Sequence, residues 1–403
     1  MRCSARSWLA AASIVCGASQ AALATEFRFD GQIRLRFEGM DSTFVAGIEP
    51  SSTVPLRTRL GVTAVIAENL QAVLQVQDSR LFGVEASTVS NDKNLDVHQA
   101  YGEVRSAWSR GEWRVRGGRQ EWSYGSERII GTTDWSNVGR VFDALHARLQ
   151  QGGWTVDLAA ARIAQLASGP NDTDDLFLSY NRYSFPSRDV AAEFYALYRD
   201  DSRGAFETTV GERLAGSGGR VRYEQELAYQ MGRREQRDLG ALLFSAQAHV
   251  RLAERGKPTL GAGFDYLSGD DLGTAENEHF DVNRIFHTGH KFYGLMDVAE
   301  RLAGTSGFLD PYAVLAFQGA RDLRATTTVH VFFLDTTTFP GGLQAAGAGD
   351  YLGTEVDLVL GITPREKLRL ELGGAVFVPG DEMRDRDQGA TGSWAYAQAT
   401  LGF

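Results

Sequence analysis

Cysteine is almost missing from this sequence of 403 residues. The two cysteines, Cys3 and Cys16, both fall within the first 24 residues, which have the pattern of a removable leader. A mature chain without cysteine has no disulfide framework, no thiolate metal site and no cysteine nucleophile. We therefore expect no cofactor that depends on thiolate ligands.

The first 24 residues have the features of a signal peptide. Arg2 and Arg6 make the start basic, residues 8–15 form a short apolar stretch, and Ala22-Leu23-Ala24 places small residues before a cleavage point. The apolar stretch is shorter than the roughly 20 residues that a membrane helix needs. The sequence therefore predicts an exported chain in which residues 1–24 are removed and residues 25–403 form the mature protein.

Long hydrophobic runs and linkers are also missing. After Ala24 no stretch of 18 apolar residues occurs, and this excludes a helical membrane span. The nine prolines are scattered, and the 45 glycines show no low-complexity run. These absences favour a single all-β unit over residues 25–403 rather than a string of soluble domains.

Lysine is scarce, since only four of the 41 basic residues are lysine and 37 are arginine. Removal of the leader leaves 39 basic and 51 acidic residues, a net charge of −12, which argues against a nucleic-acid partner. No G-x-S-x-G, P-loop or H-E-x-x-H motif occurs, so we do not expect an enzyme. The histidines His279, His287 and His290 show no pattern of ligands around them, and we expect no metal site there.

Alternation of apolar and polar residues dominates the rest of the chain. Ile33, Leu35 and Phe37 fall on one face of an extended segment, and Arg34 and Arg36 fall on the other. In a soluble sandwich the polar face points outward, whereas in a membrane barrel it points inward and the apolar face meets lipid. Similar runs occur at residues 56–60, 72–77, 145–149 and 368–372.

The connections between these runs alternate in length, as in outer-membrane barrels. The last run, residues 394–403, ends in Phe403, and a terminal aromatic strand is typical of chains that the barrel-assembly machinery inserts. We therefore predict an all-β transmembrane antiparallel β-barrel of about 18 strands, with 16 as the second choice, in the lipid bilayer of a bacterial outer membrane. The short connections are 67–70, 108–111, 151–153 and 363–366, and the long ones are 81–94, 122–140, 268–290 and 378–391.

Two segments carry a family resemblance, one within residues 117–143 and one within residues 265–297. On these residues the sequence resembles the alginate-export family of outer-membrane proteins. The first segment holds Gly118-Arg119-Gln120-Glu121, Tyr124-Gly125, Glu127-Arg128, Gly131, Asp134-Trp135, Asn137, Gly139-Arg140 and Phe142-Asp143; the second holds Asp265-Tyr266, Ser268-Gly269-Asp270, Phe280, His290, Phe292-Tyr293-Gly294 and Asp297.

The resemblance implies an 18-stranded barrel in a Gram-negative outer membrane, with an arginine-rich lumen that passes alginate or another solute. This chain departs from the family pattern in being acidic overall and shorter than the dedicated exporter. Three functions therefore stay open. The first is a channel for anionic or sugar solutes, with export of an alginate-like anionic polysaccharide as one option. The second is a non-specific uptake porin, and the third is a plugged barrel with an adhesion or structural role.

A pore that selects anions needs fixed positive charge facing water inside a low-dielectric wall. The polar strand faces and the loop within residues 117–143 supply such groups, and we expect Arg128 and Arg140 to face solute. The alternative is that wall arginines pair with Glu38, Glu103 and Glu121, and that loop charges anchor the loop. The predicted pore-lining set is Arg34, Arg36, Arg57, Arg59, Arg114, Arg116, Arg119, Arg128, Asp134, Arg140 and Arg148.

Three aromatic residues of the same loop, Trp122, Tyr124 and Trp135, have two possible roles. They either stack on the faces of sugar rings or belong to an aromatic girdle at the membrane interface.

Overall fold

The computed structural model describes residues 26–41, 49–85, 94–165, 173–201, 205–234, 237–270, 276–281, 285–336, 350–384 and 389–403. The predicted signal peptide lies outside these residues. Over the described ranges the chain is almost entirely β-strand.

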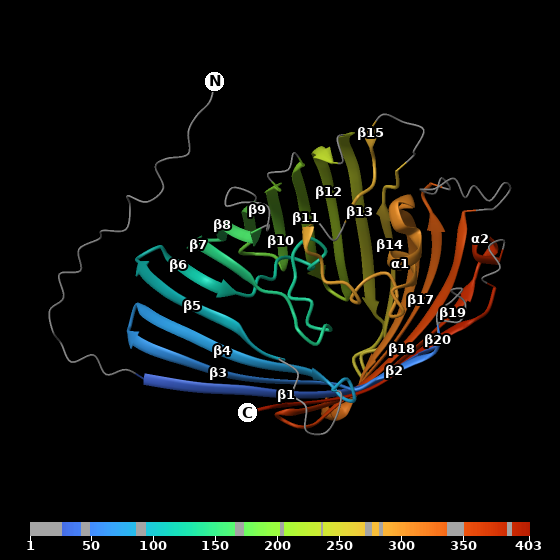
Figure 1. Cartoon of the computed structure of the whole chain (residues 1–403), viewed down its shortest axis with the longest axis horizontal. Coiled ribbons are helices and arrows are strands. Elements are labelled where there is room, and N and C mark those ends of the chain that lie inside the picture. Colours follow the sequence, from blue (N-terminus) through green and yellow to red (C-terminus); the bar gives the residue numbers. More distant parts are fainter. Residues whose placement is uncertain are drawn as a thin grey trace.

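One closed antiparallel barrel is formed by 18 long strands among the described residues. β1 is hydrogen bonded to β3 on one side and to β20 on the other, so the first and last strands close the barrel (Figure 1). The prediction of 18 strands rather than 16 is confirmed. The wall strands are β1 (Glu26–Asp41), β3 (Pro55–Ala67), β4 (Leu70–Leu81), β5 (Leu95–Trp108), β6 (Gly111–Gln120), β7 (Phe142–Gln151), β8 (Trp154–Gln165), β9 (Thr173–Ser184), β10 (Val190–Asp200), β11 (Phe206–Gly218), β12 (Val221–Arg234), β13 (Arg237–Arg251), β14 (Thr259–Leu267), β16 (Phe308–Gln318), β17 (Arg324–Leu334), β18 (Tyr351–Arg365), β19 (Leu368–Pro379) and β20 (Gly392–Gly402).

Several short elements lie in the connections. β2 pairs with β1, and β15 is parallel to β13. Neither helix of the described chain is long and apolar enough to cross a bilayer. The short elements are β2 (Ser51–Thr53), β15 (Glu276–Asn277), α1 (Val298–Ala303), η2 (Gly304–Ser306), η3 (Ala320–Asp322) and α2 (Asp381–Arg384).

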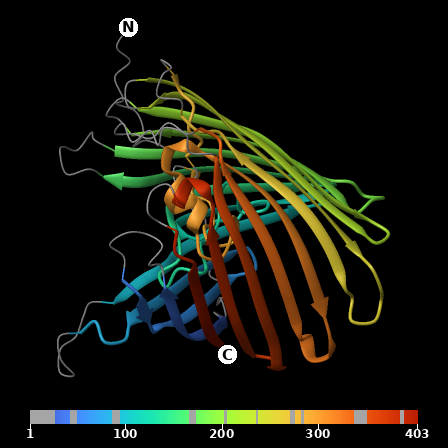
Figure 2. The ribbon, with the colours of Figure 1, turned by 90° about the vertical axis from the view of Figure 1, so that its right-hand side faces the viewer.

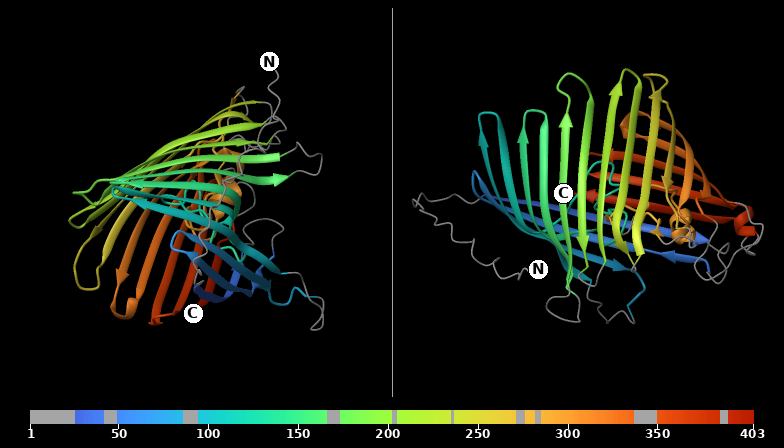
Figure 3. Two further views of the ribbon diagram at one scale, coloured as in Figure 1. Left: turned by 90° about the vertical axis from the view of Figure 1, so that its left-hand side faces the viewer. Right: turned by 90° about the horizontal axis from the view of Figure 1, so that it is seen from above.

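The connections alternate in length around the barrel, and the tight turns gather at one end of the tilted strands (Figure 2 and Figure 3). Two predicted boundaries are wrong. The turn expected at residues 363–366 lies after Arg365, because a register irregularity after Ile362 lets β18 accommodate Pro364 and continue. The long connection expected to end at residue 290 continues to Gly307, where β16 follows.

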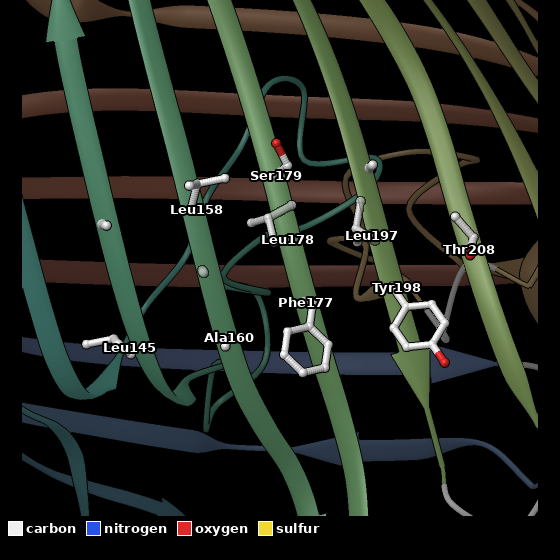
Figure 4. Close-up of a pocket in the computed structure, with 12 residues that line it drawn as sticks. Leu145, Leu158, Ala160, Phe177, Leu178, Ser179, Leu197, Tyr198 and Thr208 are labelled. Atoms are coloured by element: carbon white, nitrogen blue, oxygen red, sulfur yellow. The ribbon is translucent and has the colours of Figure 1, made fainter. Parts of the chain in front are cut away.

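The apolar strand faces point outward and the polar faces point inward. Phe37 is 55% exposed on the outer wall, whereas Arg34 and Arg36 on the same strand are buried inside. Figure 4 shows the outer wall around β9, where Leu158, Phe177 and neighbouring apolar residues surround a shallow groove of about 500 Å³. An apolar exterior and a polar interior are what a barrel in lipid requires.

Two connections fold back into the barrel and fill much of its lumen. We call residues 121–141, between β6 and β7, the first luminal segment. Residues 285–306, which include α1, form the second luminal segment. Both lie inside the ring of strands in Figure 1, and both contribute to a buried cluster that includes Trp122, Ile130 and Met296.

Candidate functional site

Four arginines of β1 and β3 form a cluster on the inner wall. Arg34 and Arg36 alternate with outward apolar residues on β1, and Arg57 and Arg59 alternate with Leu56, Thr58 and Leu60 on β3. The register places Arg34 directly opposite Arg57. All four side chains are buried, because the first luminal segment lies over them. We refer to these four residues as the arginine cluster.

The arginine cluster holds the backbone of the first luminal segment. Its guanidinium groups donate to the carbonyl oxygens of four residues between positions 134 and 138. Hydrogen bonds from a charged donor are stronger than those between neutral groups. Gln77 of β4 adds a bond of 2.8 Å to the oxygen of Val138. The arginine bonds run from Arg34 to Asp134 and Ser136, from Arg36 to Trp135 at 2.9 Å, from Arg57 to Asp134 at 3.2 Å and from Arg59 to Val138 at 3.3 Å.

Asp134 places its carboxylate among these guanidinium groups. Its oxygens lie 2.7 Å from Arg57, 3.9 Å from Arg34 and 4.0 Å from Arg59. The side chain is 65% exposed inside the lumen. Burial opposes ionisation, but the three positive charges prevail and hold the pKa of Asp134 below its ordinary value. Asp134 is therefore a charged group that faces lumen water.

Carboxylates of the wall and of the first luminal segment balance most of the arginine cluster. Arg36 pairs with Glu38 at 3.0 Å, and Arg59 pairs with Glu121 at 3.3 Å. With Asp134, these carboxylates give three negative charges against four guanidinium groups. The cluster therefore keeps an excess of positive charge, although each arginine also has a structural partner.

A second group of arginines lies on the inner face of β6 and β7. Arg116 pairs with Glu103 at 2.8 Å, and Arg148 pairs with Asp157 at 2.5 Å. Arg114 lies opposite Arg148, and no ion pair of Arg114 is found among the described residues. Arg116 therefore forms the pair with Glu103 that the sequence offered as the alternative to a pore-lining role. Arg114 is half-buried and has no carboxylate partner among the described residues.

Arg119 and Arg128 occupy positions that do not face the open lumen. Arg119 pairs with Asp143 at 3.1 Å near the rim of the barrel. Arg128 is 2% exposed, pairs with Asp265 of β14 at 3.0 Å and stacks over Phe292 at 4.0 Å. Burial opposes the charge, yet Asp265 keeps the pKa of Arg128 above its ordinary value. Arg128 is thus an anchor of the first luminal segment, contrary to the expectation that it faces solute.

Arg140 joins the two luminal segments. Its Nη1 donates to the carbonyl oxygens of Gly131, at 3.2 Å, of Phe286 and of His287, at 2.7 Å. Burial lowers the pKa of Arg140 to about 10, although Glu300 opposes the shift. Arg140 stays protonated at neutral pH, and its bonds occupy it with protein carbonyls rather than solute.

The three aromatic residues of the first luminal segment all lie inside the barrel and not in an interfacial girdle. Trp122 stacks on Phe142 with ring centres 4.4 Å apart, and Tyr124 is buried beside it. Trp135 lies between the guanidinium of Arg36, at 3.7 Å, and the ring of His290, at 4.0 Å. Both faces of Trp135 are therefore covered by protein.

Local backbone geometry allows the first luminal segment to press against the wall. Gly125 has φ +55, and a Cβ built there would lie 2.7 Å from the hydroxyl oxygen of Tyr180. Only glycine combines that conformation with that approach. The hydroxyl of nearby Ser126 donates to Glu226 at 2.6 Å.

Sequence reasoning missed the carboxylates that hold the second luminal segment. Glu355 and Asp357 point inward from β18 and accept bonds from the backbone N–H groups of Met296, at 2.7 Å, and Leu295, at 3.2 Å. The signal was present in the sequence, since Glu355 and Asp357 alternate with outward Val356. Over the described ranges, no group of three or more His, Cys, Asp or Glu side chains is arranged to hold a metal ion.

Comparisons with known proteins agree with this geometry. Solved structures with a similar fold include OpdO of Pseudomonas aeruginosa, with 12% identity over 94% of this chain and 96% of that chain and a TM-score of 0.61. They also include OccAB4 of Acinetobacter baumannii, with 10% identity over 94% and 98% and a TM-score of 0.64. OpdK of Pseudomonas aeruginosa, solved with vanillate, has 10% identity over 94% and 98% and a TM-score of 0.61.

No curated protein gave a significant sequence match. A family model described as alginate export matches residues 25–396, nearly the whole chain. This chain therefore belongs to the alginate-export family and is a barrel channel of the bacterial outer membrane.

Proposed function

We propose that the barrel selects anionic, sugar-derived solutes such as uronates by means of the arginines on one side of its lumen. The observation that carries this proposal is the arginine cluster, in which four guanidinium groups outnumber three carboxylates beneath the first luminal segment. Arg114, Arg116 and Arg148 extend the positive wall toward β7. Membership of the alginate-export family supports the same class of solute.

The buried arginines act on solute through their field rather than by contact. Their donors are engaged by loop carbonyls, so a passing anion meets the positive potential without displacing those bonds. A low-dielectric wall focuses such a potential into the water-filled space. Weak attraction of this kind suits transport, because a tightly bound anion would not leave.

The channel is passive in this proposal and has no catalytic role. The described lumen wall presents ion-paired arginines and carboxylates, and we assign no reaction to them. We further propose that the barrel-assembly machinery reads the final strand, β20, and the Phe403 that follows it. Phe403 exchanges backbone hydrogen bonds with Gly31, which seals the junction between the last and first strands. Export of an alginate-like polysaccharide and uptake of a smaller uronate are both compatible with these features.

Ion selectivity in planar bilayers tests the proposal. Under a KCl gradient we expect a reversal potential that shows preference for chloride, and we expect Arg114→Gln to reduce that preference. Arg110→Gln, an exposed arginine in the β5–β6 turn, is the matched control and should leave the potential unchanged. A cation-selective channel would contradict the proposal.

The packing of the lumen favours one second candidate, a plugged barrel with an adhesion or structural role. Both luminal segments belong to one buried cluster with the wall, including Phe142 and Phe308. A plugged barrel would show no conductance steps in the same bilayers. Regular conductance steps would exclude the plugged barrel and support the channel function.

A further inference from the structure

Three polar side chains interrupt the apolar outer wall on neighbouring strands. They are Asn181 of β9, Glu212 of β11 and Gln225 of β12. Asn181 and Glu212 both lie opposite Phe194 of β10, which is 52% exposed on the outer wall. Gln225 is two residues from Leu227, another exposed residue, so strand alternation turns it outward as well. Away from the strand ends, Glu212 is the one charged residue on the outer face of the described strands.

Glu212 and Gln225 leave hydrogen-bonding groups unused. Nε2 of Gln225 donates to one carboxylate oxygen of Glu212 at 2.7 Å. A side-chain amide has two N–H groups and a carboxylate has two oxygens. Among the described residues no other group engages this pair, so Gln225 keeps one N–H and Glu212 keeps one oxygen. Both side chains are only partly buried, and a partner outside the chain can therefore reach them.

Lipid does not complete this polar pair. Glu212 lies in the middle of β11 (Phe206–Gly218), away from the rims where headgroups and water are found. Acyl chains neither donate nor accept hydrogen bonds, and a charged side chain on the lipid face of a barrel is costly. Inside a membrane, another protein surface supplies the missing donors and acceptors. The pair therefore points to a protein partner on this side of the barrel.

The pair is complementary to a second copy of itself. A twofold axis along the membrane normal keeps every residue at the same depth in both copies. The spare N–H of Gln225 in one protomer would then donate to the spare oxygen of the partner's Glu212. The same bond forms in the opposite direction, so one contact satisfies both spare groups of both copies.

The wall beside the pair has the relief that a packed interface needs. A groove of about 500 Å³ runs over β7–β11, and Ser179, which accepts a bond of 3.1 Å from Asn181, is one of its lining residues. The short side chain of Ala196 deepens the groove, and Phe177 stands out beside it (Figure 4). Small and large side chains next to one another allow two such walls to interdigitate.

We propose that the outer face of β9–β12 is the interface of a homodimer within the membrane, with Glu212 and Gln225 at its centre. The interface is independent of the proposed anion preference, because this face meets the bilayer whereas the arginine cluster faces the lumen.

Energy transfer between labelled copies in liposomes tests the proposal. The double variant Glu212→Leu, Gln225→Leu turns the patch into an ordinary lipid face, so it should fold like the wild type, which urea titration checks. We expect this variant to need a roughly tenfold higher protein-to-lipid ratio for half-association, the effect of two hydrogen bonds inside a membrane. Thr58→Leu, on the outer face of β3 across the barrel, is the control and should leave association unchanged.

Cysteine cross-linking gives a second readout that keeps Glu212 and Gln225 in place. Residues 25–403 contain no cysteine, so Leu227→Cys introduces a single thiol beside the pair. We expect oxidation in liposomes to join two copies of this variant, seen as a dimer band after denaturing electrophoresis. Leu60→Cys, which is 50% exposed on β3, is the matched control and should stay monomeric.

The contrary results are distinct from one another. A wild type without energy transfer at any protein-to-lipid ratio overturns the dimer, and equal association of the wild type and the double variant overturns the role of the polar pair. Equal cross-linking of Leu227→Cys and Leu60→Cys shows random collision and also overturns the interface. A cross-link from Leu227→Cys to a different protein in native outer membranes, with no homodimer in liposomes, overturns the second copy as the occupant. The reversal potential of the same preparations reports on anion preference separately.

Discussion

At the scale of single residues, the luminal guanidinium groups anchor the first luminal segment and, in the function proposed above, also select the solute. Arginine suits both tasks, because it stays protonated when buried and offers five donors in a fixed fork. Arg57 illustrates the division: it is fully buried, bonds to the backbone of the first luminal segment, and still pairs with an exposed Asp134. Selection and loop position are therefore coupled in the same side chains.

The first prediction concerns the pH dependence of Asp134. Its pKa is lowered in the docked segment, so its contribution to docking is present above the ordinary value of about 3.9 and is lost as pH falls through the lowered pKa. We expect constant conductance from about pH 7 to pH 5 and a rise below about pH 4, measured on single channels. In Asp134→Asn this acid step should disappear, and a step of unchanged size would assign it to another group.

The second prediction concerns the buried pair of Arg128 and Asp265. Arg128→Met leaves a lone buried carboxylate and should destabilise the docked segment by about 3–5 kcal/mol. The double variant Arg128→Met, Asp265→Leu should recover most of this loss. Urea titration with protease cleavage of the first luminal segment measures the effect.

The matched control for that pair is Lys291→Met. Lys291 pairs with Glu127 in a half-exposed position, so its loss should cost about 1 kcal/mol or less. Equal destabilisation by Arg128→Met and Lys291→Met would show that burial of the pair is unimportant.

At the scale of elements, the two luminal segments behave as one docked unit. The second segment contains four residues other than glycine with positive φ: Phe286, His290, Tyr293 and Asp297. Each such conformation costs of order 1–3 kcal/mol, and docking must offset that cost. Stacking of His290 on Trp135 and the bonds from Arg140 tie the strained segment to the first one.

The third prediction follows from this coupling. Trp135→Ala should loosen both segments, because it removes the ring between Arg36 and His290. Large-to-small changes at a buried tryptophan cost about 3–5 kcal/mol, and a smaller loss is expected at this half-buried site. We expect higher mean conductance with more fluctuation, and faster proteolysis at both segments.

Trp108→Ala provides the control for Trp135→Ala, because Trp108 is exposed at the end of β5. This variant should leave the current and the cleavage pattern unchanged. Loosening of the first segment alone in Trp135→Ala would contradict the coupling.

At the scale of the whole molecule, the inner wall is divided by charge. Basic residues predominate from β1 to β7, where the arginine cluster and Arg114 lie. Buried carboxylates gather on the opposite strands, from β10 to β18. In the function proposed above, such a division creates a field across the lumen that draws anions toward the basic side. The carboxylates are Glu193, Glu207, Glu226, Asp265, Asp310, Glu355 and Asp357.

The fourth prediction tests the placement of the outer wall in lipid. Leu158 is 54% exposed on β8, and Leu158→Arg should cost about 2–4 kcal/mol if the site lies near the bilayer midplane. Folding into liposomes, followed by urea titration, measures this cost. Asn69→Arg in the β3–β4 turn should be nearly neutral, and equal effects at both sites would contradict the membrane placement.

Much of the barrel follows from local pattern, and much of the site does not. Alternation at Ile33 to Phe37 predicts which side chains face lipid, because a strand has a period of two. The same rule predicts that Arg36 points inward but not that Trp135 will cover it. The inward fold of residues 121–141 depends on guanidinium donors from β1 and β3, which are far away in sequence, and no local pattern records those donors.

The sequence by itself determined the all-β barrel and the polarity of its two faces, and it favoured about 18 wall strands over 16. These features depend on a repeat of two residues and on the cost of placing charge in lipid. Only the tertiary structure decided which charges meet. Arg128 reads like a solute-facing residue in sequence, yet Asp265 buries it, and His290 and Thr133 meet across a cavity although 157 positions separate them. Ion pairing and cavity shape depend on distances between segments, and those distances exist only once the barrel has closed around its loops.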